Sequence, residues 1–413
     1  MIKKIAAWWR SVAHVWVREV TLSFRDPGVI IFFLVVCAAY PVLYSLIYNP
    51  EVERDMPVVV IDNNRSHLSR ELTRKLDATP EVAVVATAVD LNEAREMLNR
   101  KQCYGIVVIP QDFSSDIARG IQTHVVTYSD MSLMLRYKNL LMAITNVTQA
   151  MGAEMQSEAL AAVAHVHGSI IESRQVPLSN TGMGIASAIL LFVLPLVVQQ
   201  SMILGIGMLH GGSIERRRRN GGRDPEAIDA SVSATIIGKT LCHVVIYILP
   251  TVYALHFTPI FFDFPQNGDL FQIMLMALPF VIGVSLMGQV LQVLVNERES
   301  VFVLFAFSSV LFIFLSGASW PRYAMSPFWR AVGDCLPCMW MSNAYTAMQA
   351  DGATLSQLGR SFAIMWIQVV VLYVLAYLVE RFVSRVRYRV WQRRTDSDPE
   401  ALSRFDIVKN GVL

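Results

Sequence analysis

The sequence predicts an α-helical polytopic membrane protein with six transmembrane helices, an interfacial helix before the first span and an α/β domain inserted after it. Hydrophobic residues make up 54% of the 413 residues and charged residues only 16%, whereas about a quarter of the residues in soluble domains are charged. Six apolar stretches are long enough to cross a bilayer. Between the first two, β-branched runs alternate with helical patterns, which is typical of an α/β domain.

Residues 1–27 predict an amphipathic helix at the cytoplasmic surface of the membrane. At about 100° per residue, six apolar side chains between residues 3 and 20 share one arc: Ile5, Trp8, Trp9, Val12, Trp16 and Val20. Four basic or potentially basic side chains take the opposite arc: Lys3, Arg10, His14 and Arg18. Indoles at the interface and cations toward anionic lipid are typical of a helix in the headgroup plane. A helix packed on a partner is the alternative interpretation.

The spans follow from length and hydropathy. A helix rises about 1.5 Å per residue and hydrocarbon is about 30 Å thick, so a span needs roughly 20 largely uncharged residues. The predicted spans are Gly28–Tyr48, Met183–Leu209, Thr240–Phe262, Leu270–Val295, Val301–Ser319 and Ser361–Val379. No small-residue cleavage site follows the first apolar run, so we expect a retained span instead of a signal peptide.

The distribution of lysine and arginine predicts the orientation. Basic residues resist translocation, so short cytoplasmic loops collect them. Twenty of the 35 lie before the first span, between the second and third, in the turn Asn296–Ser300, or after Val379. Of the other fifteen, twelve lie in the long insert, and long translocated domains escape the rule. We therefore expect a multi-pass protein of the bacterial inner membrane with both termini cytoplasmic and the insert external.

These assignments divide the rest of the chain. Residues 49–180 form the external α/β domain with a long return helix. Spans two to six fall within residues 181–383, where residues 210–239 form a cytoplasmic loop and residues 320–360 an external loop. Residues 384–413 form a basic cytoplasmic tail.

The insert has the pattern of a small sheet with helices on it. The expected strands are Pro57–Ile61, Val82–Val89, Tyr104–Ile109 and His124–Tyr128. The expected helices are Ser66–Leu76, Leu91–Arg100 and Asp112–Arg119, with Ser66 and Asp90 as caps, followed by a long helix from Met131 to about Ser173. No catalytic constellation is apparent, so we interpret the domain as a module for contact with a partner or substrate.

Several classes of site are not predicted. A Gly-x-x-x-x-Gly-Lys-Ser/Thr stretch is absent, so ATP and Mg²⁺ must bind to another subunit and no cofactor is expected in this chain. The net charge of +2 gives no indication of a nucleic-acid partner. His165 and His167 are two residues apart and fall on different helix faces, which argues against a metal site.

The spans hold almost no ionisable residues. Such residues are costly in hydrocarbon and usually mark ion relays, and only His243 and His256 lie within the predicted spans. A proton- or sodium-coupled carrier is therefore not predicted. Four neutral side chains are candidates for polar positions on a translocation path: Gln199, Gln200, Gln289 and Gln292. Hydrogen bonding between helices is the alternative and commoner role of such glutamines.

Two short motifs lie outside the spans. Four consecutive arginines, Arg216–Arg219, follow the second span. They fit the positive-inside rule, and a docking surface for a cytosolic subunit is a second interpretation compatible with the first. Cys335 and Cys338 lie in the loop before the last span and are a candidate disulfide in an oxidising periplasm. Unbonded thiols and thiol exchange are the alternatives.

Motifs in three parts of the chain carry a family resemblance. The insert contains Val58–Asp62, Ser69–Leu72 and Gly105–Phe113. The late loop contains Ser316–Gly317, Trp320–Pro321, Pro327–Trp329 and Leu336–Pro337. Together with the interfacial helix, these resemble the permease subunits of ABC-2 type (type V) exporters, in the subgroup with a large external domain between the first two helices. The late motifs are similar to that family's external re-entrant segment, so the resemblance implies one at residues 320–360.

The resemblance also implies a docking site. Gly212-Ser213-Ile214-Glu215 is similar to the family's Gly-Thr-x-Glu element, with Ser in place of Thr. That element begins a cytoplasmic coupling helix on the ATPase, which implies docking or coupling roles for Gly212, Ser213, Ile214, Glu215, Arg216, Arg217, Arg218 and Arg219. The sequence departs from the family next, because the arginine run and Gly221-Gly222 replace an apolar, Leu-rich stretch.

The function that the resemblance implies is the permease of an ATP-binding cassette exporter. Its partners would be a dimer of cytosolic ABC ATPase subunits and a second permease copy or paralogue, with membrane lipid, a periplasmic adaptor and an outer-membrane channel as further candidates. The ATPase would hydrolyse ATP, and this chain would move a drug, lipid or envelope component outward. A membrane thiol oxidoreductase using Cys335 and Cys338 and a non-transporting envelope scaffold are the alternative hypotheses.

Overall fold

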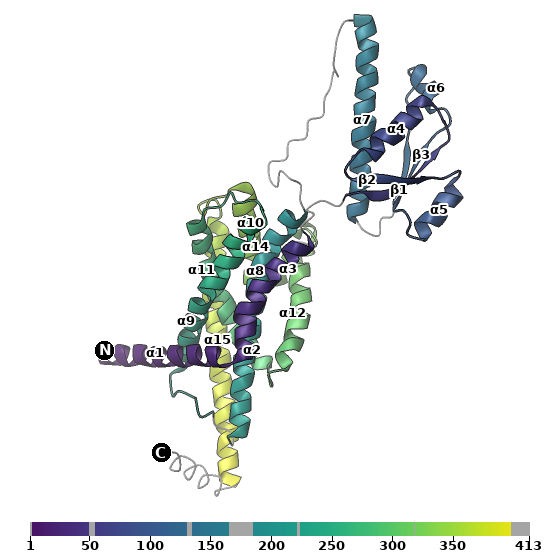
Figure 1. The fold of residues 1–413 in the computed structure, drawn as a ribbon. Helices are drawn as coiled ribbons and strands as arrows, with labels where there is room; N and C mark the ends of the chain where they lie inside the picture. The colour runs from purple at the N-terminus through teal and green to yellow at the C-terminus, as the bar shows by residue number, and fades with distance from the viewer. Residues whose placement is uncertain are drawn as a thin grey trace. The chain divides into compact units, whose positions relative to one another are not determined.

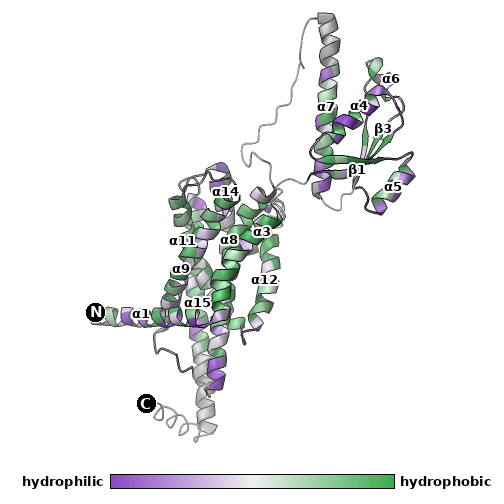
Figure 2. Cartoon of the chain, viewed as in Figure 1, coloured by the Kyte–Doolittle hydropathy of each residue, from purple (hydrophilic) through white to green (hydrophobic). Residues whose placement is uncertain are grey.

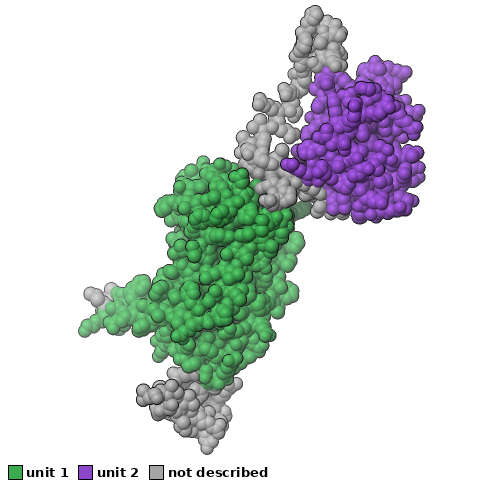
Figure 3. Space-filling view, in the orientation of Figure 1, with its two compact units in different colours: residues 1–51, 177–413 green, residues 52–176 purple. Residues whose placement is uncertain are grey.

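The chain folds as two compact units (Figure 3). The computed structural model describes residues 2–48, 54–129, 134–164, 185–220, 224–317 and 319–397. One unit, called the helical unit, comprises Met1–Glu51 and Pro177–Leu413. The other, called the α/β unit, comprises Val52–Val176. Each has its own hydrophobic core.

The described part of the helical unit contains helices and no strands (Figure 1). Its first elements are α1 (Ile2–Arg25), α2 (Pro27–Ile30), a π-helix (Ile31–Val36) and α3 (Cys37–Ile47). After the α/β unit come α8 (Ile185–Arg219), α9 (Val232–Val252), a π-helix (Tyr253–Phe257), α10 (Thr258–Phe261) and α11 (Leu270–Leu291). The last elements are α12 (Ser300–Ser316), α13 (Pro327–Asp334), α14 (Pro337–Asp351) and α15 (Gly359–Ser397), with 3-10 turns at Gln292–Leu294 and Arg322–Ala324.

The described chain has five helices that are long and apolar enough to cross a membrane: Pro27–Ile47, Ser187–Arg219, Val232–Phe261, Leu270–Leu294 and Gly359–Val383. Hydrophobic residues run along these helices in Figure 2. The other predicted span, Val301–Ser319, corresponds to α12, an apolar helix of 17 residues. Helix α12 ends at Ser316 because Gly317 adopts a left-handed conformation with φ of +96°. Its 17 residues therefore span only about 25 Å. The described residues thus contain five span candidates and one shorter apolar helix in place of six predicted spans.

Helix α8 is the most deeply buried of the five. It contacts α3, α11, α12 and α14, and 78% of its apolar window is buried, against 11% for α15. Small residues allow the close packing: a Cβ at Gly205 would overlap the ring of Phe33, and one at Gly288 would lie 2.7 Å from Ile206. Helix α15 instead directs most of its apolar surface outward, which suits a helix in contact with lipid.

A π-helix interrupts two of the span candidates, and a proline follows each of them at Pro41 and Pro259. Proline has no N–H, so the carbonyl four residues earlier loses its helical donor. The Leu255 carbonyl, four residues before Pro259, instead accepts from the Tyr345 hydroxyl at 2.6 Å and from Gln349 Nε2 at 3.3 Å. Both side chains belong to α14, so these bonds fasten α14 to the third span candidate.

Helix α1 lies within the predicted residues 1–27 and packs against α9. Its buried face includes Val12 and Val15, and a Cβ at Gly238 would lie 2.8 Å from Val15. The Trp9 side chain stays 56% exposed. The predicted apolar arc is therefore shared between packing inside the chain and an exposed surface.

The α/β unit alternates strands and helices in sequence. Its elements are β1 (Met56–Asp62), α4 (His67–Asp77), β2 (Val82–Thr87), α5 (Leu91–Asn99), β3 (Gly105–Ile109), α6 (Phe113–Ala118), β4 (Val126–Ser129) and α7 (Met134–Ala164). The strand order is β2-β1-β3-β4. Strand β1 is parallel to β2 and β3, and β4 is antiparallel to β3. The part of the predicted long helix beyond residue 164 lies outside the described residues.

Helices cover both faces of this sheet. Alternate residues of β1 point to opposite faces: Val58 and Val60 join a core with residues of α4, α6 and α7, whereas Val59 and Ile61 join a core with residues of α5. Figure 1 shows α5 on the opposite side of the sheet from α4 and α7. The predicted caps are confirmed, because Ser66 Oγ accepts from the N–H of Ser69 and the Asp90 carboxylate accepts from that of Glu93.

Two predicted boundaries differ in the helical unit. The loop predicted at 210–239 begins later, because α8 continues to Arg219 and arginine is a good helix former. The tail predicted at 384–413 is helical to Ser397 as part of α15, and residues 398–413 lie outside the described residues. Within residues 320–360, predicted as re-entrant, α13 and α14 form a helical pair, and α14 packs against α8, α11 and α15.

Candidate functional site

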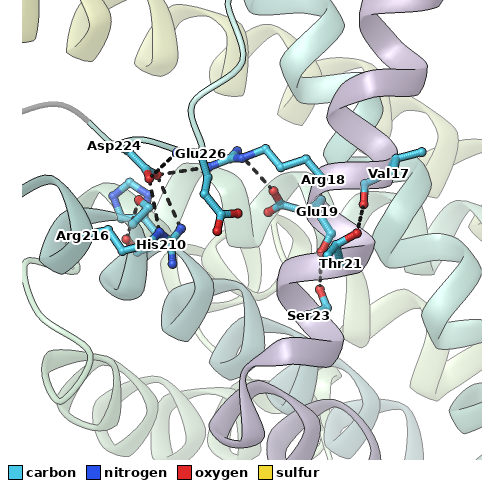
Figure 4. Close-up of polar contacts among 10 residues, drawn as sticks. Val17, Arg18, Glu19, Thr21, Ser23, His210, Arg216, Asp224 and Glu226 are labelled. Atoms are coloured by element: carbon cyan, nitrogen blue, oxygen red, sulfur yellow. Dashed lines mark hydrogen bonds and ion pairs between the residues drawn. The ribbon is translucent and has the colours of Figure 1, made fainter. Parts of the chain in front are cut away.

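A buried carboxylate joins the end of α8 to α1. The Asp224 side chain is 1% exposed and accepts from Arg18 Nη2 of α1 at 3.1 Å and from Arg216 Nε of α8 at 3.2 Å (Figure 4). The N–H of Glu226 also donates to its Oδ1, at 3.1 Å. A buried charge is tolerated only where it is paired and hydrogen-bonded, so Asp224 holds both arginines in place.

A second set of ion pairs lies at the same end of α8, around Arg298. This residue is in the turn between α11 and α12, and its guanidinium pairs with Asp26 at 2.7 Å and with Glu215 at 3.2 Å. The Glu215 carboxylate also accepts from the backbone N–H of Arg298 at 3.3 Å. A Cβ at Gly211 would lie 2.8 Å from the Arg298 backbone, so glycine permits this approach. We call Arg18, Asp26, Glu215, Arg216, Asp224 and Arg298 the arginine-end cluster.

The cluster borders a partly open polar cavity. A cavity of about 200 Å³ is lined by residues of α1, α8, α9 and α15, including Glu19, Lys239 and Glu380. Glu19 is 4% exposed and lies 3.6 Å from Arg18. Acidic and basic groups are mixed in this lining, so the region is a network of internal ion pairs more than a surface of one sign.

The predicted docking residues occupy one continuous helix. Gly212, Ser213 and Ile214 lie in the penultimate turns of α8 and begin no separate coupling helix in the described structure. Ser213 Oγ donates to the His210 carbonyl at 2.7 Å. Glu215 and Arg216 belong to the arginine-end cluster, whereas Arg218 pairs with Glu297 at the surface, both 58% exposed. Arg219 is exposed and Arg217 is half-buried.

The sequence analysis missed four members of the cluster: Arg18, Asp26, Asp224 and Arg298. Arg18 was assigned to the cationic arc of the first helix, opposite the apolar arc and toward anionic lipid headgroups, whereas it faces Asp224. Two features of the sequence could have identified the acidic residues Asp224 and Asp26. Asp224 follows the arginine run by five residues, and Asp26 stands at the start of a span as the N-cap of α2, where its carboxylate accepts from Gly28 N at 3.1 Å.

The predicted polar candidates in the spans are buried and mostly bonded across helices. Gln289 Nε2 donates to Thr240 Oγ1 of α9 at 2.9 Å, and Gln200 Oε1 accepts from Ser308 of α12 at 3.4 Å. Gln199 Oε1 accepts from the N–H of Cys338 at 3.0 Å. Gln292 is buried in the 3-10 turn after α11. These contacts favour interhelical hydrogen bonding, the alternative role in the sequence analysis.

The bond to Cys338 has a clear local cause. The first N–H groups of a helix have no intrahelical acceptor, and α14 begins at Pro337 without a side-chain cap from its own N-cap residue. Gln199 of α8 supplies the missing acceptor. Cys338 is buried and Cys335 exposed, and both are free thiols, so the described structure offers no accessible pair for thiol chemistry.

Comparison with known proteins places the chain in a family. The ABC-2 family transporter protein domain matches residues 27–378, from the first span candidate into the last. The chain belongs to the ABC-2 transporter family. It is 23% identical over 368 residues to the linearmycin resistance permease protein LnrN of Bacillus subtilis (strain 168), with 82% of this chain and 91% of that protein covered. The family and that relative's name indicate that the chain is a transporter membrane subunit. The five span candidates agree with such a subunit.

Proposed function

We propose that this chain is the permease subunit of an ATP-binding cassette exporter, which moves an amphiphilic or lipid-like molecule outward with energy from a separate cytosolic ATPase dimer. The arginine-end cluster is the observation that carries the proposal. It ties three parts of the helical unit together: the first helix through Arg18, the end of α8 through Arg216, and the turn before α12 through Arg298. A force applied there would reach all three.

The orientation supports docking at this end. Arg216–Arg219, Arg298 and the basic first helix lie on the side that the positive-inside rule assigns to the cytoplasm. Exposed side chains there, such as Arg218 and Arg219, would face the ATPase, while Glu215 and Arg216 transmit the motion inward. The α/β unit would be external and the membrane would be the bacterial inner membrane.

The interior of the helical unit favours a largely uncharged or amphiphilic cargo. Away from the helix ends of the described span candidates, the buried polar side chains are glutamine, serine, threonine and histidine. A charged cargo crossing hydrocarbon would require opposite charges along its path. We propose a second copy of the chain or a paralogue as the other half of the path.

A charge-swap series tests this function. The full-length chain is tagged in its native cells and purified gently, and copurified proteins and their ATPase activity are measured. We expect a nucleotide-binding ATPase to copurify with the wild type. Arg298→Glu should reduce substrate export and copurification, and Arg298→Glu combined with Glu215→Arg should restore part of both, because the Arg298–Glu215 pair is rebuilt in reverse.

The control is Arg100→Glu, which reverses one member of the exposed Arg100–Glu96 pair in the α/β unit. It should leave copurification unchanged. Absence of any ATPase from the wild-type preparation would contradict the permease proposal. Full export after Arg298→Glu would contradict the coupling role proposed for this cluster, and loss of function on Cys335→Ser with Cys338→Ser would favour the thiol alternative.

A further inference from the structure

The α/β unit contains a cavity that the proposed transport mechanism does not use. It has a volume of about 470 Å³ and lies between α7 and the segment that leads from α6 into β4. Its floor is the domain core: Leu72, Phe113, Ile144 and Met151 line it and each is less than a tenth exposed. Small-molecule sites in proteins commonly measure about 300–1,000 Å³ and have mainly apolar walls.

The hollow has a cause in the sequence. Helix α6 has only six residues, so it covers a short part of the sheet face that it shares with α7. Opposite it, α7 carries small side chains at Thr145, Thr148 and Gly152. Their spacing of three and four residues puts them on one face of the helix. A Cβ at Gly152, an exposed residue of the lining, would meet no atom within 4 Å, so a larger side chain would have room there.

The lining indicates the chemistry of an occupant. No Lys, Arg, Asp or Glu is among the described residues that line the cavity, so a charged group inside would have no opposite charge to offset its lost hydration. The hydroxyl of Thr148 donates to the Ile144 carbonyl at 2.7 Å and needs no ligand. Polar side chains suitable for one hydrogen-bonding end group are present at Thr123, His124 and Thr127.

We propose that this cavity binds the hydrocarbon part of an uncharged amphiphile, with its neutral polar end near Thr123, His124 and Thr127. The apolar floor takes the chain, and the hydroxyls and imidazole take the end group. The further statement that this amphiphile is the exported cargo rests on the proposed function. Binding itself does not, because the cavity lies wholly within one compact unit.

Photolabelling of the full chain tests the site. The protein is placed in lipid nanodiscs and irradiated with dodecanol that carries a diazirine, and labelled peptides are identified by mass spectrometry. We expect saturable labelling within residues 113–127 and 141–155. Unlabelled dodecanol should compete better than octanol, by about fourfold for each additional buried methylene group, whereas dodecylammonium should compete poorly because its charge would be buried.

Gly152→Leu should abolish labelling at these peptides, because the new side chain occupies the hollow. The matched control is Ala150→Leu, an exposed position two residues away that does not line the cavity. Thr145→Leu provides a second blocking variant if Gly152→Leu does not fold. Labelling confined to the span candidates, or unchanged by a folded blocking variant, would overturn the proposal. No ATPase is present in this assay, so its result is independent of the export function.

Discussion

Two sets of contacts hold the helices of the helical unit together, the arginine-end cluster and the hydrogen bonds around α14, and they use different chemistry. At the arginine end, helices are joined by ion pairs that centre on Asp224 and Arg298. Around α14, they are joined by neutral bonds: Gln199 to the N–H of Cys338, and Tyr345 to the Leu255 carbonyl. The arginines at the first site are 17–33% exposed, whereas Gln199 and Tyr345 are fully buried.

This difference follows from access to water. A partly hydrated guanidinium keeps some of its solvation while it pairs with a carboxylate. Ion pairs are therefore tolerated at the end of a helix. Inside the bundle a charge would lose that solvation, so backbone groups freed by Pro259 or by a helix start are satisfied with amides and hydroxyls. The ionic site should therefore respond to salt and charge changes, and the neutral site to the loss of single acceptors or donors.

The largest expected effect is at Asp224. Asp224→Ala leaves Arg18 and Arg216 facing each other without their shared carboxylate, and breaking a buried ion pair costs about 3 kcal/mol. The thermal unfolding midpoint of the purified chain should fall clearly. Asp229→Ala, at an exposed acid of the same loop, is the control and should leave the midpoint unchanged. Equal midpoints for the two variants would mean that the pairs at Asp224 contribute little.

The second effect tests the close contact beside the ionic site. In Gly211→Val the new Cβ would lie 2.8 Å from the backbone of Arg298, so the turn before α12 must shift. Overpacking of this kind costs about 1–3 kcal/mol. Measured stability should fall, and crosslinking between cysteines placed at residues 215 and 298 should weaken. Gly359→Val, where a Cβ meets no atom within 4 Å, should do neither.

The third effect concerns the neutral site. Tyr345→Phe removes one of the two donors to the Leu255 carbonyl, and Gln349→Leu removes the other. Each single change should cost about 1 kcal/mol. The double variant should cost more than the two together, because only then is the buried carbonyl left without either donor. Strict additivity in a stability assay would show that the two donors do not share this role.

The smallest effect is expected at Arg218. Its pair with Glu297 is exposed on both sides, and such pairs contribute about 0–1 kcal/mol. Arg218→Ala should thus leave the unfolding midpoint nearly unchanged while it lowers ATPase copurification, since this side chain is proposed to face the partner. A fall in stability as large as that of Asp224→Ala would contradict the division between surface and buried pairs.

Local patterns predicted much of the secondary structure. Length and hydropathy depend on neighbouring residues, so all five span candidates overlap predicted spans. The strands and short helices of the α/β unit also match within a few residues, because β-branched runs and the caps Ser66 and Asp90 act locally. The end of α12 was missed: it stops at Gly317 in a left-handed conformation, whereas the apolar composition continues.

Only some residues of the candidate site were predicted from the sequence. Arg216 was identified from the arginine run and Glu215 from the family resemblance, but several residues that complete the cluster lie far away along the chain. Arg18 and Asp224 are separated by 206 positions, and Asp26 meets Arg298 only once α2 and the α11–α12 turn are folded. Likewise, the glutamines were recognised as polar, but the N–H of Cys338 as the partner of Gln199 depends on how α14 packs on α8.

The uninterrupted length of α8 has a mechanical consequence. Gln199 and Gln200 are fastened near its middle to α14 and α12, and Arg219 ends it twenty residues beyond Gln199, a distance of about 30 Å. With the glutamines as a pivot, a tilt of only about 5° would swing the arginine terminus by about 2.6 Å. A modest displacement of the arginine end would therefore change the tilt of α8 at its contacts with α14 and α12.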